Sequence, residues 1–223
     1  MTIFDLIFIL GVLCTTGAML FAAFQFLRGR RQNASRTVAG VAVALTAYLA
    51  IVVVVSLATP QRILPQSELR CSDEWCLSVD RVTRTDSIGS YIVVTPGDVL
   101  YLVDVRVSSQ SRGRPQREVG VALYLLDSTG RRYDPDSEGE RALAAAGRAG
   151  APLDQLVNPG ESFIHRVAFR VPSNAAGLGL AKSGSGPGAF IIGDDASLFH
   201  KRTVTRLDQV ERAGRGAVAP NLR

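Results

Sequence analysis

Cys71 and Cys76 are the residues best placed to do chemistry, because they lie five positions apart and outside both long apolar segments of the chain. A turn between them brings the two Cα atoms within the roughly 4.4 to 6.8 Å that a disulfide requires. The spacing differs from the two-residue interval of a redox pair, and two thiols without neighbouring histidines make a poor metal site. We therefore expect a disulfide that contributes about 2 kcal/mol at most, because the loop it closes is short.

His165 and His200 are the only histidines, and they raise the question of a catalytic or ligand-binding pair. One interpretation makes His165 a ligand or base that shares a site with His200. The other makes His165 a partly buried, hydrogen-bonded residue near the end of a strand, and no fixed spacing links the two histidines. Asp194 and Asp195 could offer oxygens to a hard cation, but they lack the alternating carboxylates of a calcium loop and fit a solvated turn.

Motifs of the large enzyme families are absent from the sequence: there is no nucleophile elbow, zinc-binding helix, kinase motif set or dinucleotide fingerprint. We expect a protein that is not an enzyme, with no catalytic residues, no metal ligands and no cofactor.

Two long apolar segments dominate the N-terminal quarter of the chain. The chain is 47% hydrophobic, and the excess is concentrated in residues 3–27 and 37–58, which hold 25 and 22 residues. Each exceeds the roughly 20 residues that span a bilayer as a helix. Residues 1–58 are therefore predicted to form a transmembrane helical hairpin in the lipid bilayer, and the first segment lacks the basic start and cleavage site of a secretory signal.

Four arginines lie in the connection between these segments, at Arg28, Arg30, Arg31 and Arg36. The positive-inside bias predicts that this loop, residues 28–36, stays in the cytoplasm. Both termini and everything after residue 58 then lie outside the cytoplasm, which for a bacterial chain means a multi-pass protein of the cell (inner) membrane.

The formal net charge of +5 is not a nucleic-acid signal once it is divided by region. Residues 60–223 carry 21 basic and 19 acidic side chains, so this part is nearly neutral. No basic helix or ladder of stacking aromatics accompanies the arginines, and we expect no nucleic-acid partner.

Small residues recur every four positions in both apolar segments. They are Cys14, Ala18 and Ala22 in the first, and Ala42, Thr46 and Ala50 in the second. One interpretation packs the two stripes against each other, as helices in lipid often do; the other attributes the spacing to chance in alanine-rich spans.

The remainder divides into a linker at residues 59–70, a domain at 71–208 and a flexible tail at 209–223. Alternating apolar residues predict half-buried antiparallel strands over 99–107, 119–125 and 163–171. Shorter strand candidates are residues 77–83, 91–94, 189–192 and 200–207. Turn sequences such as Asn158-Pro-Gly160 separate them, and a capping box of Ser137 and Glu140 begins one brief helix. This succession indicates an all-β sandwich with one short helix.

Several sequence pieces, in order, carry a resemblance to a known family. They are Cys71-Ser-Asp-Glu-Trp-Cys76, Tyr101-Leu-Val-Asp-Val-Arg-Val107, Asp127-Ser-Thr-Gly-Arg-Arg-Tyr133, Asn158-Pro-Gly-Glu-Ser162 and Val167-Ala-Phe-Arg-Val-Pro172. Over residues 70–208 the chain resembles a bacterial immunoglobulin-like extracellular domain of unknown function, related in fold to a mycobacterial secreted immunoprotective protein. The resemblance implies an immunoglobulin-like antiparallel β-sandwich in the cell envelope and no particular reaction.

These observations lead to two functional hypotheses. The first is a non-catalytic, membrane-tethered extracytoplasmic module that binds an envelope protein or a surface ligand. The alternative is an accessory subunit of a membrane complex that assembles through its transmembrane hairpin.

Overall fold

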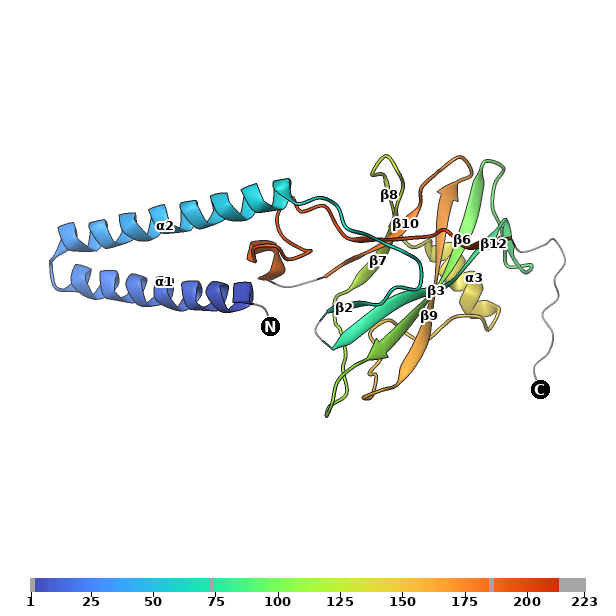
Figure 1. The fold of residues 1–223 in the computed structure, drawn as a ribbon, viewed down its shortest axis with the longest axis horizontal. Helices are drawn as coiled ribbons and strands as arrows, with labels where there is room; N and C mark the ends of the chain where they lie inside the picture. Colours follow the sequence, from blue (N-terminus) through green and yellow to red (C-terminus); the bar gives the residue numbers. More distant parts are fainter. Residues whose placement is uncertain (1–2, 73, 185–186, 213–223) are drawn as a thin grey trace. The chain divides into compact units, whose positions relative to one another are not determined.

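A computed structural model describes residues 3–72, 74–184 and 187–212, and these form two compact units (Figure 1). The helical unit comprises residues 3–61 and 187–202. The sandwich unit comprises residues 62–72, 74–184 and 203–212. The predicted domain, residues 71–208, is therefore interrupted by a segment that belongs with the helices.

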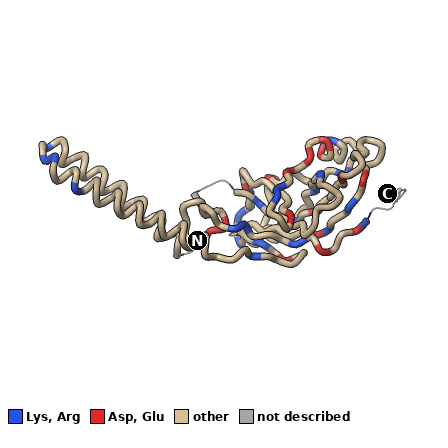
Figure 2. The backbone as a smooth tube through the Cα atoms, turned by 90° about the horizontal axis from the view of Figure 1, so that it is seen from above, with Lys and Arg blue, Asp and Glu red and all other residues tan. Residues whose placement is uncertain are grey.

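The helical unit is built on two packed helices, α1 (Ile3–Leu27) and α2 (Arg31–Ala58). Both are long and apolar enough to cross a membrane. The second helix begins six residues earlier than expected, so the connection shrinks from 28–36 to 28–30, and Arg31 and Arg36 lie in the first turns of α2. Figure 2 shows the basic residues of the two helices and their connection gathered at the turn, with no charged residue along the rest of α2.

The stripe of small residues on α1 is covered only in part, because Cys14 is exposed. Ala22 is buried and Ala18 half-buried, as close helix packing requires. The corresponding residues of α2, Ala42, Thr46 and Ala50, are all exposed. The interpretation in which the two stripes contact each other is therefore wrong for α2.

Residues 187–202, which we call the return segment, complete the helical unit. The segment was expected to contain a strand at 189–192, but it holds a single 3₁₀ turn, η1 (Pro187–Phe190), followed by loops. Tyr48 in α2 donates its hydroxyl to the carbonyl of Phe190 at 2.7 Å, so the segment is tied to the helix by a hydrogen bond.

The sandwich unit contains two main sheets. One has the order β1-β11-β10-β7-β8 and the other β12-β3-β6-β9, with β2 paired to the end of β3. The strands are β1 (Ile63–Leu64), β2 (Arg70–Ser72), β3 (Trp75–Thr85), β4 (Ser87–Ile88), β5 (Ile92–Val93), β6 (Asp98–Ser109), β7 (Ala122–Leu126), β8 (Arg132–Tyr133), β9 (Ser162–Pro172), β10 (Gly179–Ser183), β11 (Val204–Arg206) and β12 (Val210–Arg212). Strands β4 and β5 form a separate hairpin. The predicted β-sandwich with one short helix is confirmed at this level.

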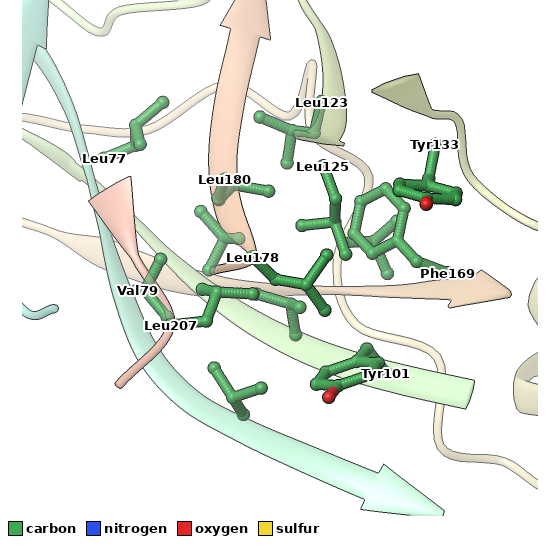
Figure 3. Packing of buried hydrophobic residues seen from close by; sticks show 14 of the residues in the cluster. Leu77, Val79, Tyr101, Leu123, Leu125, Tyr133, Phe169, Leu178, Leu180 and Leu207 are labelled. Carbon is green, nitrogen blue, oxygen red and sulfur yellow. The ribbon is translucent and has the colours of Figure 1, made fainter. Parts of the chain in front are cut away.

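The main core lies between the two sheets, where the alternating apolar positions of both meet (Figure 3). Tyr101 and Phe169 come from the β6–β9 side, and Leu123, Leu125 and Leu180 from the other sheet. All five are at most 8% exposed. Burying side chains of this size contributes roughly 1.5 to 3 kcal/mol each and holds the two sheets together.

The expected linker and tail are more ordered than predicted. Ile63–Leu64, inside the expected linker, pairs in parallel with β11, and Val210–Arg212, inside the expected tail, pairs in parallel with β3. Both segments are too short to show a hydrophobic period, which explains why the pattern missed them. Residues 213–223 of the expected tail lie outside the described residues.

Helix α3 (Ser137–Ala145) lies between β8 and β9 along the chain and packs on β9. Its N-cap is Asp136, whose carboxylate accepts the N–H of Gly139 at 3.0 Å, so the expected cap at Ser137 is off by one residue. Glu140 does not reach back to the cap as expected. Its carboxylate accepts the backbone N–H of Ala168 in β9 at 2.6 Å and fastens the helix to the sheet.

Candidate functional site

The two cysteines are joined by a disulfide, as expected. Cys71 and Cys76 lie directly opposite each other in the β2–β3 hairpin, with their Cα atoms 3.9 Å apart. Trp75 beside them is only 2% exposed, and the ammonium of Lys182 lies 5.3 Å from the centre of its ring. This corner is thus a packed part of the fold, with the indole in the core.

The two histidines fall in different units. His165 lies in β9, half-buried, with Nδ1 2.8 Å from the carbonyl oxygen of Ala151, whereas His200 belongs to the return segment. Neither unit contains both histidines, so neither forms the predicted two-histidine site on its own. The carboxylate of Asp194 accepts the N–H of Ala196 at 2.6 Å, as in a simple turn. Among the described residues, no group of three His, Cys, Asp or Glu side chains is placed to hold a metal ion.

A cavity of the sandwich unit lies between the β4–β5 hairpin and helix α3, and we call it the hairpin groove. Its volume is about 510 Å³, within the usual range for small-ligand sites. Its lining residues come from two elements that are far apart in sequence: Tyr91, Ile92 and Val93 from the hairpin, and Glu138, Arg141, Ala142 and Ala145 from α3.

A second apolar cluster supports the groove from below. Ile88 of the hairpin and Leu143 of α3 are fully buried in this cluster, and Ile92 packs against it. The hairpin and the helix therefore rest on the same apolar cluster, which forms the floor of the groove. The alternation of the hairpin then points Tyr91 and Val93 away from the floor, where they are 57% and 73% exposed. Exposed apolar side chains beside a cavity are typical of binding surfaces.

The charges at the rim are asymmetric. Glu138 accepts a hydrogen bond from Nη2 of Arg170 at 2.6 Å, and this contact, with a second to Asp136, raises the pKa of the arginine. Arg141 donates only through Nε, to the carbonyl of Ser137 at 3.2 Å, and makes no ion pair within the described part of the chain. The groove therefore offers a guanidinium with two free nitrogens and a carboxylate that already pairs with Arg170.

This arrangement can make two kinds of contact with a ligand. Tyr91 and Val93 offer contact area to an apolar or ring-shaped face, and Arg141 offers paired donors to a carboxylate or other anionic group. None of the groove's lining residues is a cysteine, serine, threonine or histidine.

A second cavity, of about 440 Å³, opens at the end of the sandwich beside Arg206 and Asp208. Much of its wall is core: Tyr101, Leu178 and Leu207 are at most 8% exposed. We regard this cavity as a gap at the end of the two sheets, and the hairpin groove as the stronger candidate.

Sequence reasoning did not find the hairpin groove. Tyr91 was expected to begin a short strand, and Glu138 and Arg141 were expected in a helix, but nothing in either segment indicates that the two meet. The available signal was the aromatic Tyr91 directly after Gly89 and Ser90 in a turn, where a large side chain is often displayed.

No protein-family model and no curated protein matches the chain. Among solved structures it is similar to a conserved hypothetical protein from Bacillus anthracis, with 12% identity, a TM-score of 0.42, and coverage of 53% of this chain and 89% of that one. It is also similar to an uncharacterized β-sandwich protein from Clostridium difficile, with 10% identity, a TM-score of 0.39, and coverage of 67% and 96%. The sandwich assignment follows from the strand pairing itself.

Proposed function

We propose that this chain is a non-catalytic binding module of the bacterial cell envelope, anchored in the inner membrane by α1 and α2 with its sandwich outside the cytoplasm. In this arrangement the hairpin groove is the binding site. Its ligand presents an apolar or ring face to Tyr91 and an anionic group to Arg141, and it belongs to an envelope protein or a surface ligand.

The hairpin groove carries the binding part of this proposal. It combines a cavity of ligand size, two strongly exposed apolar side chains and an arginine without an acidic partner. A fold that needed the region only for stability would gain by covering Tyr91 and Val93, because each leaves apolar area in water.

The length and charge of the helices support the anchoring part. Both helices exceed the span of a bilayer, and the basic residues gather at the turn between them (Figure 2). A disulfide at Cys71–Cys76 agrees with an oxidising compartment outside the cytoplasm.

The strand order supports an immunoglobulin-like topology for the sandwich unit. The neighbours β3-β6-β9 correspond to strands A-B-E, and β11-β10-β7 correspond to G-F-C, the two sheets of an immunoglobulin domain. In that scheme β4–β5 belongs to the A–B connection and α3 to the connection that enters strand E.

The binding proposal is tested by photo-crosslinking in intact cells. A photoreactive amino acid placed at Tyr91 should capture a defined partner, and Arg141→Ala should abolish that product. The control position is Leu156, which is 56% exposed elsewhere on the sandwich unit. The same products from both positions, or a Tyr91 product that survives Arg141→Ala, would contradict the proposal.

The topology is tested separately with a C-terminal reporter that is active only in the cytoplasm. The proposed arrangement gives an inactive fusion. A fusion that is active would overturn the placement of the sandwich outside the cytoplasm.

A second candidate function is an accessory subunit that assembles through its helices. Its supporting observation is that Ala42, Thr46 and Ala50 remain exposed on α2, where a partner helix could approach closely. Ala42→Leu with Ala50→Leu should then disrupt a complex isolated in mild detergent. The control is Val43→Leu, at a position that is 70% exposed and already carries a larger side chain. An unchanged complex would remove this candidate.

A further inference from the structure

The return segment displays large apolar side chains although it is folded. Phe190, Leu198 and Phe199 are 46%, 37% and 69% exposed within a stretch of ten residues. A short polar loop has no need of three such side chains, and grouped exposed apolar residues mark an interaction surface.

The segment has its own interior, so this exposure is not the result of an unfolded chain. Ile191 and Ser197 are buried, and the serine hydroxyl donates to the carbonyl of Ile191. The N–H of Leu198 donates to the carbonyl of Ala189 at 3.0 Å and closes the loop. The fold of the segment therefore separates a small buried side from an apolar displayed side.

Phe199 is held in an unusual backbone conformation. Its φ of 63° lies in the left-handed region, which a bulky aromatic residue rarely adopts. Such a conformation is energetically unfavourable and persists where the surrounding structure imposes it. Here it accompanies the most exposed aromatic ring of the segment.

The hydrogen bond to Tyr48 fixes where along α2 the segment lies. In α1, the polar residues Asp5 and Gln25 are separated by a rise of about 30 Å, which is the thickness of a hydrocarbon core. The same length along α2, measured from Arg31 at the turn, ends near Ile51. Tyr48 lies about one helical turn inside that level. Because Tyr48 donates to Phe190, the return segment sits at the outer boundary of the proposed membrane span.

We propose that the return segment is an interfacial lip, in which Phe190, Leu198 and Phe199 enter the outer leaflet of the lipid bilayer beside α2. Apolar side chains displayed at that level meet the boundary between headgroups and acyl chains, where amphipathic segments bind. The inference rests on the proposed insertion of α1 and α2. It adds a third point of attachment, contributed by residues more than 120 positions after the helices end.

The test is the quenching of tryptophan fluorescence by brominated lipid. Full-length protein is reconstituted into phosphatidylcholine vesicles whose lipid carries bromine either near the glycerol end or near the methyl end of one acyl chain. Trp75, which is only 2% exposed in the sandwich core, supplies a background common to all variants. Two probes, Phe199→Trp and Phe190→Trp, each add one indole to the lip.

Two matched variants separate this inference from the membrane anchor itself. Leu13→Trp, 64% exposed and near the middle of α1, reports on helix insertion, and Leu156→Trp reports on an exposed apolar position of the sandwich unit. We expect bromine near the glycerol end to remove most of the emission added by either lip probe, and bromine near the methyl end to remove most of that added by Leu13→Trp. Leu156→Trp should lose little with either lipid.

The outcomes are distinct. If Leu13→Trp is quenched while both lip probes behave like Leu156→Trp, the interfacial lip is wrong and the anchor stands. Lip probes quenched more strongly by the deep bromine would also overturn an interfacial position. If Leu13→Trp is not quenched, the anchor and the lip fail together.

Discussion

Asp104 lies directly opposite Arg166 on the paired strands β6 and β9, and the guanidinium binds the carboxylate as a bidentate ion pair. Nε lies 2.5 Å from Oδ1 and Nη2 lies 2.7 Å from Oδ2. The side chains are only 10% and 25% exposed, and the hydrogen bond from the arginine to the carboxylate raises the pKa of Arg166. The pair is thus a charged, partly desolvated link across the outer face of the sheet.

Removing one member of this pair should destabilise the fold more than removing both. Asp104→Leu or Arg166→Met leaves a partly buried charged group without its partner, which costs about 1 to 3 kcal/mol. The double variant should recover part of that loss, giving a coupling energy of about 1 kcal/mol or more in a double-mutant cycle. Urea unfolding followed by the emission of Trp75 measures all three variants.

The comparison pair is Arg106 and Asp80 on the same sheet. Their distance is similar, at 2.7 Å, but their side chains are 44% and 40% exposed. Solvent screening should reduce their coupling to below about 1 kcal/mol. Equal coupling energies for the two pairs would show that burial does not determine the strength of the ion pair.

The disulfide should contribute little to stability. Reduction of Cys71–Cys76, or Cys71→Ser combined with Cys76→Ala, is expected to lower the free energy of unfolding by about 2 kcal/mol at most, because so short a loop loses little entropy when it closes. Unfolding curves with and without reductant measure the effect, and Cys14→Ser with the disulfide intact is the control. A loss well above this bound would show that the bridge stabilises the sandwich as a whole.

Glu140 should make stability fall as the pH rises. Burial raises the pKa of its carboxyl above the ordinary value of 4.5, although the N–H of Ala168 opposes this shift. The folded state therefore favours the protonated form, and stability decreases as the pH rises from about 4.5 through the raised pKa.

Glu140→Gln removes this ionisation and keeps an oxygen for the N–H of Ala168. The variant should gain stability relative to wild type as the pH rises through that window, and the difference should level off on either side of it. Free energies of unfolding measured across the acidic range check the sign. A difference that is independent of pH would contradict the prediction.

The long strands could be predicted because each has one buried face. Expected strands at 99–107 and 163–171 correspond to β6 and β9, which extend one or two residues further at each end. The turn from Asp127 to Tyr133 could also be predicted, because it is held by hydrogen bonds between residues close in sequence. Asp127 accepts hydrogen bonds from the Thr129 hydroxyl, the backbone of Arg131 and the Tyr133 hydroxyl, and these lower its pKa to about 2.

What could not be predicted depends on contacts distant in sequence. The hairpin groove forms where Ile88 and Leu143 join one buried cluster. The return segment is tied to α2 by a hydrogen bond from Tyr48, across 142 residues of chain. Hydrophobic periodicity reports which face of a segment is buried but does not report what covers it.

Strand β10 was missed altogether, and its first residue explains why. Gly179 is a weak strand former, but an added Cβ there would overlap Cγ1 of Val204 in the neighbouring strand β11. Glycine is therefore needed for close packing of two strands, at φ values that any residue could adopt.

Gly179→Ala should destabilise the sandwich by about 1 to 3 kcal/mol, as overpacking of a core does. Val204→Ala removes the atom that the new methyl group would strike, so adding it to Gly179→Ala should cost less than the same change in wild type. Gly113→Ala, at a position with nothing within 4 Å, is the matched control and should leave stability nearly unchanged. If the losses from Gly179→Ala and Val204→Ala simply add, the close approach to Val204 is not the reason for glycine at this position, and the absence of a strand signal in β10 needs another cause.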